Sequence, residues 1–127
     1  MLVRIFSMVL RVCGILVLIL GILFWAHAAG GIFVLIHMLL GILVALSLIA
    51  LGFVIATAKK GGSIGLGIGA LVVAILVIGL GLTQQGLLAK PGDPHWIIQF
   101  VHMLLGLLAI GMGEMITARY RRAGKVA

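Results

Sequence analysis

Four long runs of apolar residues constrain the fold of this chain more than any other feature. They cover approximately residues 5–27, 32–58, 64–82 and 95–118. Each run comes close to or exceeds the roughly 20 residues that a helix needs to cross the hydrocarbon core of a bilayer. The chain is 65% hydrophobic and only 9% charged, which is far from the composition of a soluble globular domain. The sequence therefore predicts an all-α integral membrane protein, a single domain over residues 1–127 that lies in the lipid bilayer.

Short connections between the apolar runs predict how the helices are arranged. Gly30 and Gly31 make a tight turn between the first two runs, and residues 59–63 form a short link between the second and third. Helices joined by short links lie side by side and antiparallel. Before the fourth run, Asp93 and Pro94 are typical of a helix N-cap followed by a first helical residue. The sequence thus predicts an up-down four-helix bundle whose last helix begins directly after them.

The formal net charge of +7 arises from nine Lys and Arg residues against two acids. Lys90 lies on one side of the predicted bundle, and the other eight cations share the opposite side: Arg4, Arg11, Lys59, Lys60, Arg119, Arg121, Arg122 and Lys125. By the positive-inside rule, this distribution predicts cytoplasmic N- and C-termini in a multi-pass protein of the cell (inner) membrane. A nucleic-acid partner is excluded, because the cations form short clusters between apolar runs rather than a basic stripe on a polar face.

One pentapeptide, HMLLG, occurs twice, each time inside an apolar run. It begins at His37 and again at His102, on the second helix of each predicted hairpin. The repeat suggests that the bundle arose from duplicated helical hairpins. A histidine inside the membrane is energetically costly and marks a functional site by default. Two such histidines, each followed by glycine one helical turn later, suggest a shared ligand.

In an up-down bundle the second and fourth helices are diagonal and parallel. The two histidines are therefore predicted to lie at the same depth in the bundle. Each is about six residues below the outer end of its helix, or roughly 9 Å at the helical rise per residue. Gly41 and Gly106 lie four residues later on the same helix faces. Gly21 and Gly79 of the other two helices fall at about the same depth. All four helices are thus predicted to carry a glycine in place of a side chain at one depth. A flat metallomacrocycle would fit there between two axial imidazoles.

The ligand set favours haem over a metal ion held by side chains alone. A structural zinc site needs four protein ligands and a catalytic one usually needs three, and no acid or thiol is near the two histidines. Haem b needs only axial ligands, and imidazole is a normal choice. We therefore predict one haem b bound by His37 and His102, which serves electron transfer because both axial positions are filled. The competing interpretation is that each histidine hydrogen-bonds a neighbouring helix.

With one histidine on each of its second and fourth helices, the chain resembles the b-type membrane cytochromes, including cytochrome b and the cytochrome b561-like proteins. The residues that carry this resemblance are His37, Gly41, His102 and Gly106. Corresponding helices of those families carry haem-ligating histidines with glycines alongside, and the two-haem members have a second histidine pair lower in the bundle. This sequence has no second pair. The resemblance implies a one-haem subunit near the outer face that serves quinol or a partner redox protein, either in a larger complex or as a homo-oligomer.

Further polar residues gather near the predicted outer ends of the helices. His95 lies two turns before His102 on the same helix face and is a further candidate for cofactor contact. The other members of this polar group are His27, Gln84, Gln85, Lys90 and Gln99. The group could surround haem propionates or admit a quinone, and an interfacial polar collar is the alternative.

Glu114 is the only acid within a spanning run, near the cytoplasmic end of the fourth helix. We expect it to pair with Arg11, Lys59 or Arg119 at the interface.

Other functional classes remain as alternatives or can be set aside. The chain could be a cofactor-free structural or anchor subunit, or an antenna-like subunit whose histidines bind the magnesium of (bacterio)chlorophyll. A small multidrug-type transporter shares the length and the four helices, but it depends on an acid in the first helix, which is absent here. No nucleophile–base pair or phosphate-binding loop is present, so we expect an electron-transfer or accessory subunit rather than a hydrolytic enzyme.

Overall fold

The computed structural model describes residues 1–84, 86–87 and 93–125, and its regular structure consists of four helices. They are α1 (Leu2–Trp25), α2 (Ile32–Thr57), α3 (Ile64–Thr83) and α4 (His95–Lys125). All four are long and apolar enough to cross a membrane. The predicted multi-pass, all-helical fold is confirmed. The main difference is that α4 continues past residue 118, because the arginines and alanines that end the apolar run are themselves good helix formers.

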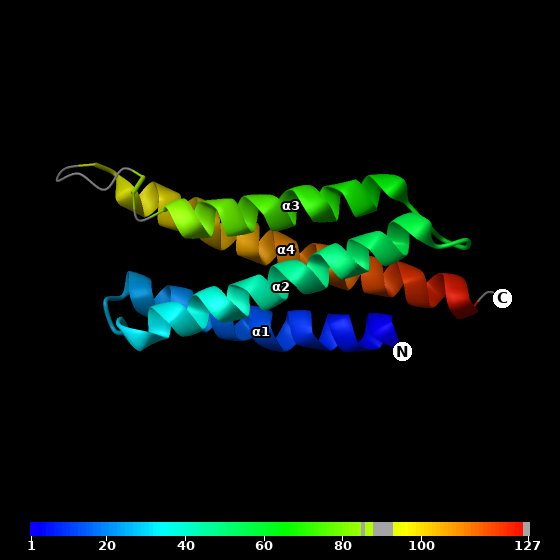
Figure 1. Ribbon diagram of the computed structural model, residues 1–127, viewed down its shortest axis with the longest axis horizontal. Helices are drawn as coiled ribbons and strands as arrows, with labels where there is room; N and C mark the ends of the chain where they lie inside the picture. Colours follow the sequence, from blue (N-terminus) through cyan, green and yellow to red (C-terminus); the bar gives the residue numbers. More distant parts are fainter. Residues whose placement is uncertain (85, 88–92, 126–127) are drawn as a thin grey trace.

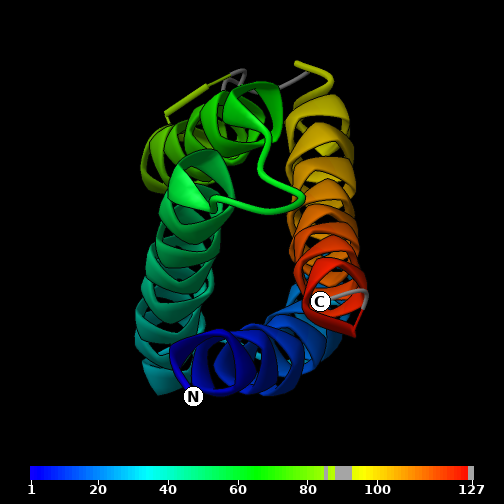
Figure 2. The ribbon, with the colours of Figure 1, turned by 90° about the vertical axis from the view of Figure 1, so that its right-hand side faces the viewer.

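The helices run alternately up and down, with both termini at one end of the bundle (Figure 1). Viewed along the bundle, α1, α2, α3 and α4 follow one another around a ring (Figure 2). The diagonal helices α2 and α4 also pack against each other, whereas the backbones of α1 and α3 do not approach each other closely within the described residues. We call the end with both termini and the α2–α3 turn the basic end. The opposite end, with the α1–α2 turn and the start of α4, is called the histidine end.

Two glycines with positive φ allow the chain to reverse direction at the described turns. Gly31 (φ 58°) precedes α2 and Gly61 (φ 66°) lies in the α2–α3 turn, both in the region that favours glycine. After Gly61, the Ser63 hydroxyl accepts a hydrogen bond of 3.3 Å from the Leu66 N–H and caps α3. The short links therefore hold consecutive helices antiparallel.

Close packing is concentrated in the basic-end half of the bundle. The large side chains that are fully buried all belong to this half: Leu10, Leu48, Leu51, Ile55, Ile116 and Thr117. Small residues allow the helix backbones to approach there. A Cβ added to Gly67 of α3 would come within 2.7 Å of the Gly52 carbonyl oxygen and 2.6 Å of the Ala56 Cβ in α2. Such contacts are typical of membrane helices, which associate by packing rather than by the hydrophobic effect.

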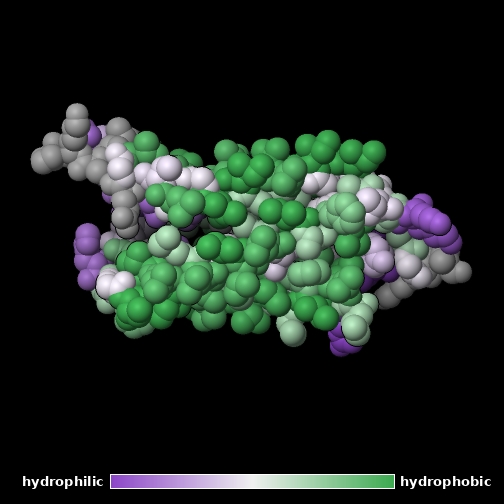
Figure 3. All heavy atoms as spheres, viewed as in Figure 1, coloured by the Kyte–Doolittle hydropathy of each residue, from purple (hydrophilic) through white to green (hydrophobic). Residues whose placement is uncertain are grey.

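Apolar side chains cover the sides of the bundle, as expected for a surface that faces lipid. In Figure 3 hydrophobic residues extend along the helices, while hydrophilic residues gather mainly at the two ends. Most of the exposed large side chains in every helix are aliphatic or aromatic. A surface of this kind is compatible with a lipid bilayer rather than with water.

We predict that Gly67→Ala destabilises the bundle by about 1–3 kcal/mol, because the added methyl group overlaps α2. Gly65→Ala is the matched control in the same helix, since nothing lies within 4 Å of its added Cβ. Thermal unfolding of both variants in detergent measures the difference. Equal stability of the two variants would contradict the packing described here.

Candidate functional site

The histidine-end half of the bundle is packed much more loosely than the basic-end half. Within the described residues, none is buried in α1 after Gly14, in α2 before Val44, in α3 after Val77 or in α4 before Ala109. The helices continue through this region, but their side chains do not pack closely enough to bury one another. The loosely packed region contains both copies of the HMLLG motif.

The two motif histidines meet across the bundle. His37 of α2 and His102 of α4 have ring centroids 6.3 Å apart and ring planes inclined by 52°. The edge of the Phe24 ring packs on His37 at a centroid distance of 5.3 Å. Above them, Trp25 of α1 contacts Phe100 of α4 with centroids 6.3 Å apart. The equal depth inferred from sequence is therefore matched by the positions of the rings, and aromatic side chains cover them toward the histidine end.

Each histidine of the pair carries a buried nitrogen without a partner. Nδ1 of His37 and Nδ1 of His102 have no hydrogen-bond partner among the described residues. A buried polar atom left in this way costs about 1–3 kcal/mol. The backbone carbonyl of Val17 in α1 approaches the His37 ring, which is the kind of contact that a purely structural histidine would make. Each ring of the pair nevertheless has one nitrogen, Nδ1, without a hydrogen-bond partner among the described residues.

Two cavities flank the histidine pair. One, of about 100 Å³, lies between α1 and α4 and includes Phe24, His37 and His102 in its wall. The other, of about 80 Å³, lies between α2 and α3 against α4 and is almost entirely apolar. Val17, His102 and Gly106 border both cavities. The two cavities therefore adjoin each other beside His102.

The glycines near the pair fall into two groups. Gly21 of α1 faces His37, with its added Cβ 3.8 Å from the ring, and Gly81 of α3 faces His102 at 3.1 Å. Gly41 and Gly106 line the cavities, and nothing lies within 4 Å of a Cβ added to either one. Unlike Gly52 and Gly67 in the basic-end half, the two motif glycines therefore do not bring helix backbones together.

Gly79 does not lie at the site, although its depth suggested that it would. It is exposed on α3 with nothing within 4 Å of an added Cβ, and Gly81 takes the inward place. Residues two apart on an α-helix point about 200° apart, so the two glycines cannot share a face. Ala70, Ala74 and Val77, which are buried, precede Gly81 at helical spacing and are the sequence signal that could have identified it.

The polar group at the histidine end is only partly assembled around the pair. Gln84 and Gln99 line the cavity between α1 and α4. His95 lines neither cavity; its Nδ1–H donates a hydrogen bond of 2.8 Å to the Leu87 carbonyl and so holds the start of α4 to the preceding segment. His27 is exposed in the α1–α2 turn. Gln85 and Lys90 lie outside the described residues.

Glu114 pairs with Arg11, one of the three partners expected for it. Arg11 Nε donates to Glu114 Oε1 at 2.6 Å and a terminal guanidinium nitrogen donates to Oε2 at 2.7 Å, a bidentate pair that joins α1 to α4. No cluster of three or more metal-ligating side chains occurs in the described part of the chain. Among the described residues, His37 and His102 therefore have no third metal-ligating side chain beside them.

Comparison of the chain with models of known protein families, with curated proteins and with solved structures finds no match. The resemblance to the b-type membrane cytochromes therefore depends on the two histidines, the two motif glycines and the helix arrangement.

We predict that Glu114→Gln lowers the thermal stability more than the double variant Arg11→Gln/Glu114→Gln. The single substitution leaves a guanidinium unpaired beside apolar helices, whereas the double substitution removes both charges. Thermal unfolding of the single and double variants in detergent measures this order. A double variant that is less stable than the single variant would contradict it.

Proposed function

We propose that the protein is a one-haem b-type cytochrome subunit, with His37 and His102 as the axial ligands and electron transfer as its function. One observation carries this proposal. Two imidazoles with unpartnered buried nitrogens meet beside two cavities, in the half of the bundle that is not close-packed.

The distance between the two rings suits a shared metal. Two imidazoles that bind one metal from opposite sides have ring centres roughly 6 Å apart, given metal–nitrogen bonds of about 2.0 Å and about 1.1 Å from nitrogen to ring centre. The observed separation of the centroids is 6.3 Å. Rings that pack directly on each other also have centroids roughly 4.5–7 Å apart, so a shared ligand is supported by this distance only together with the two unpartnered nitrogens.

The surroundings of the pair suit a flat macrocycle. The two cavities adjoin each other beside His102, and Gly106 borders both of them. Each cavity is smaller than the roughly 300–1,000 Å³ of ordinary ligand sites, so a macrocycle must displace the side chains that line the two cavities. Because no described residue in this half is buried, such a movement disrupts little packing.

When held by His37 and His102, haem would supply one-electron transfer. The residues of this chain would hold and shield the group. The two histidines orient it, Phe24 and Trp25 cover it toward the histidine end, and the apolar wall between α2 and α3 excludes water. With one histidine pair near one end, the chain serves a donor or acceptor at that end rather than carrying electrons across the whole membrane.

The orientation in the membrane completes the proposal. The positive-inside rule applied to the cations of the basic end supports a cytoplasmic location for that end and both termini. With this orientation the histidine end would face the outer side of the cell membrane, where quinol or a partner redox protein would be the redox partner. Gln84 and Gln99, the polar residues in the wall of the cavity between α1 and α4, are the side chains that a quinone headgroup would meet.

A cofactor-free anchor subunit is the second candidate function. The Val17 carbonyl beside the His37 ring favours it, since a histidine that contacts a neighbouring helix needs no ligand.

The visible spectrum of the purified protein after haem reconstitution separates the two candidates. We expect sharp haem b bands in the reduced-minus-oxidised difference, which are lost in His37→Ala and in His102→Ala. His95→Ala is the control and keeps the bands, because His95 lines neither cavity. A colourless protein would instead favour the anchor subunit. A chlorin spectrum that partly survives a single histidine substitution would favour antenna function.

A pair of glycine variants tests the position of the macrocycle. Gly106→Ala places a methyl group at the wall of both cavities, so we expect haem affinity to fall about tenfold, the effect of roughly 1.4 kcal/mol of steric conflict. The fold itself should not suffer, since nothing lies within 4 Å of the added Cβ. Gly79→Ala is the control, with the same open surroundings but on the exposed face of α3. Haem titration of both variants measures the difference, and equal affinities would argue against a macrocycle beside Gly106.

A further inference from the structure

A second site lies at the basic end, far from the histidine pair. An open pocket of about 550 Å³ is formed by the α2–α3 turn and the last turns of α4. Its charged residues are Lys60 from the turn and Arg119 and Arg122 from α4, and Gly61 and Ala123 complete the wall. Cations from two segments that are distant in sequence thus converge on one hollow.

The pocket is held in shape by contacts between the turn and α4. Arg119 Nε donates a hydrogen bond of 2.8 Å to the Gly61 carbonyl, and a terminal nitrogen of the same guanidinium donates one of 3.4 Å to Gly62. A Cβ added to Gly61 would lie 2.5 Å from the Ala123 Cβ, so the turn packs directly on the helix. Arg119 therefore holds the α2–α3 turn against α4. Lys60 and Arg122 are the other two cations that line the pocket.

No side-chain carboxylate of the protein is placed to neutralise these cations. The whole sequence contains two acidic residues, Asp93 and Glu114. Asp93 precedes α4 at the histidine end, and Glu114 is engaged by Arg11 in a bidentate pair. Neither acidic side chain is therefore placed to compete with an external anion for this pocket.

We propose that this pocket binds the phosphate of an anionic phospholipid headgroup. Guanidinium and ammonium groups together are well suited to phosphate oxygens, and basic pockets between spanning helices are where anionic headgroups bind. A lipid is the fitting source because the pocket lies where the apolar helix surfaces end. Ile64, the first residue of α3 after the turn, is 68% exposed, and Tyr120 of α4 is 40% exposed. An acyl chain can follow these surfaces while its headgroup stays in the pocket. This inference is independent of the haem proposal.

Native mass spectrometry of the full chain, mixed with phosphatidylglycerol and phosphatidylcholine in detergent, tests the proposal. We expect phosphatidylglycerol to be retained preferentially by the unmodified protein. Lys60→Gln and Arg122→Gln should each weaken that retention about fivefold, the usual contribution of one basic residue near an anionic surface. Arg119 is left unchanged, because it holds the turn.

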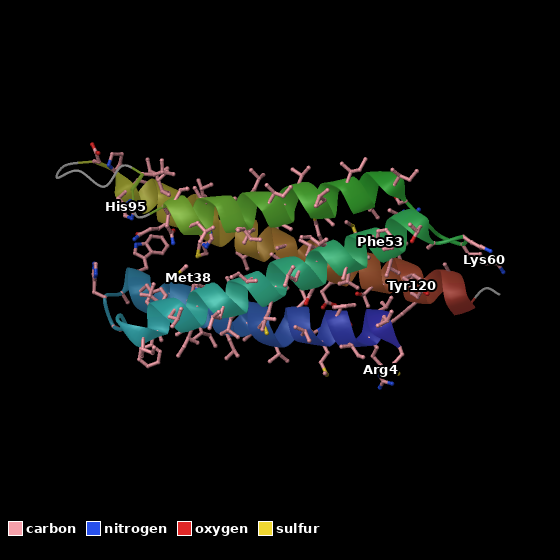
Figure 4. The ribbon with its side chains drawn as sticks, viewed as in Figure 1. Arg4, Met38, Phe53, Lys60, His95 and Tyr120 are labelled. Carbon is pink, nitrogen blue, oxygen red and sulfur yellow. The ribbon has the colours of Figure 1, made fainter. Side chains whose placement is uncertain are left out.

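Arg4→Gln is the matched control, because Arg4 is an exposed cation at the same end of the bundle but on α1 (Figure 4). It should retain phosphatidylglycerol as well as the unmodified protein does. Equal losses in all three variants would show a diffuse attraction to the basic end and overturn the site. Displacement of the bound lipid by inorganic phosphate at the same concentration would overturn the assignment to a lipid headgroup.

Discussion

Close packing between small residues in the basic-end half is the interaction on which the rest of this structure depends. Lipid tails are as apolar as the helix surfaces, so the helices gain little from hiding those surfaces and must associate through backbone approach. Gly52 and Gly67 supply this approach between α2 and α3, and Leu10 packs onto Gly113 between α1 and α4. The bidentate pair of Arg11 and Glu114 joins α1 and α4 in addition. One half of the bundle is thereby fixed.

A fixed basic-end half allows the histidine-end half to remain open. The same helices extend beyond their packed segments, and there they hold two imidazoles 6.3 Å apart with two cavities beside them. Nothing lies within 4 Å of a Cβ added to Gly41 or Gly106, whereas a glycine that packs two helices together has a neighbouring helix at that position. A bundle divided in this way can admit a large planar ligand at one end without losing its fold, which is what the proposed haem site requires.

The sequence predicted the four helices, their up-down order and the meeting of His37 with His102. These features depend on the length of the apolar runs, the short links and the depth of each histidine, all of which can be read from residue numbers. The rotation of each helix about its axis could not be predicted in the same way. Helices that are apolar on all sides carry a weak signal of orientation, so Gly79 was assigned the place that Gly81 occupies. The uneven packing along the bundle was likewise not predicted, since glycines occur in both halves.

Low-temperature electron paramagnetic resonance of the oxidised, haem-reconstituted protein, together with the haem-to-chain ratio, tests the shared ligation most directly. One haem per chain with a low-spin signal is expected, because two imidazoles fill both axial positions. Replacing His102 by alanine should abolish that low-spin signal while the protein stays folded. A low-spin haem that survives the loss of either histidine, or a folded protein that takes up no haem, would contradict ligation by His37 and His102.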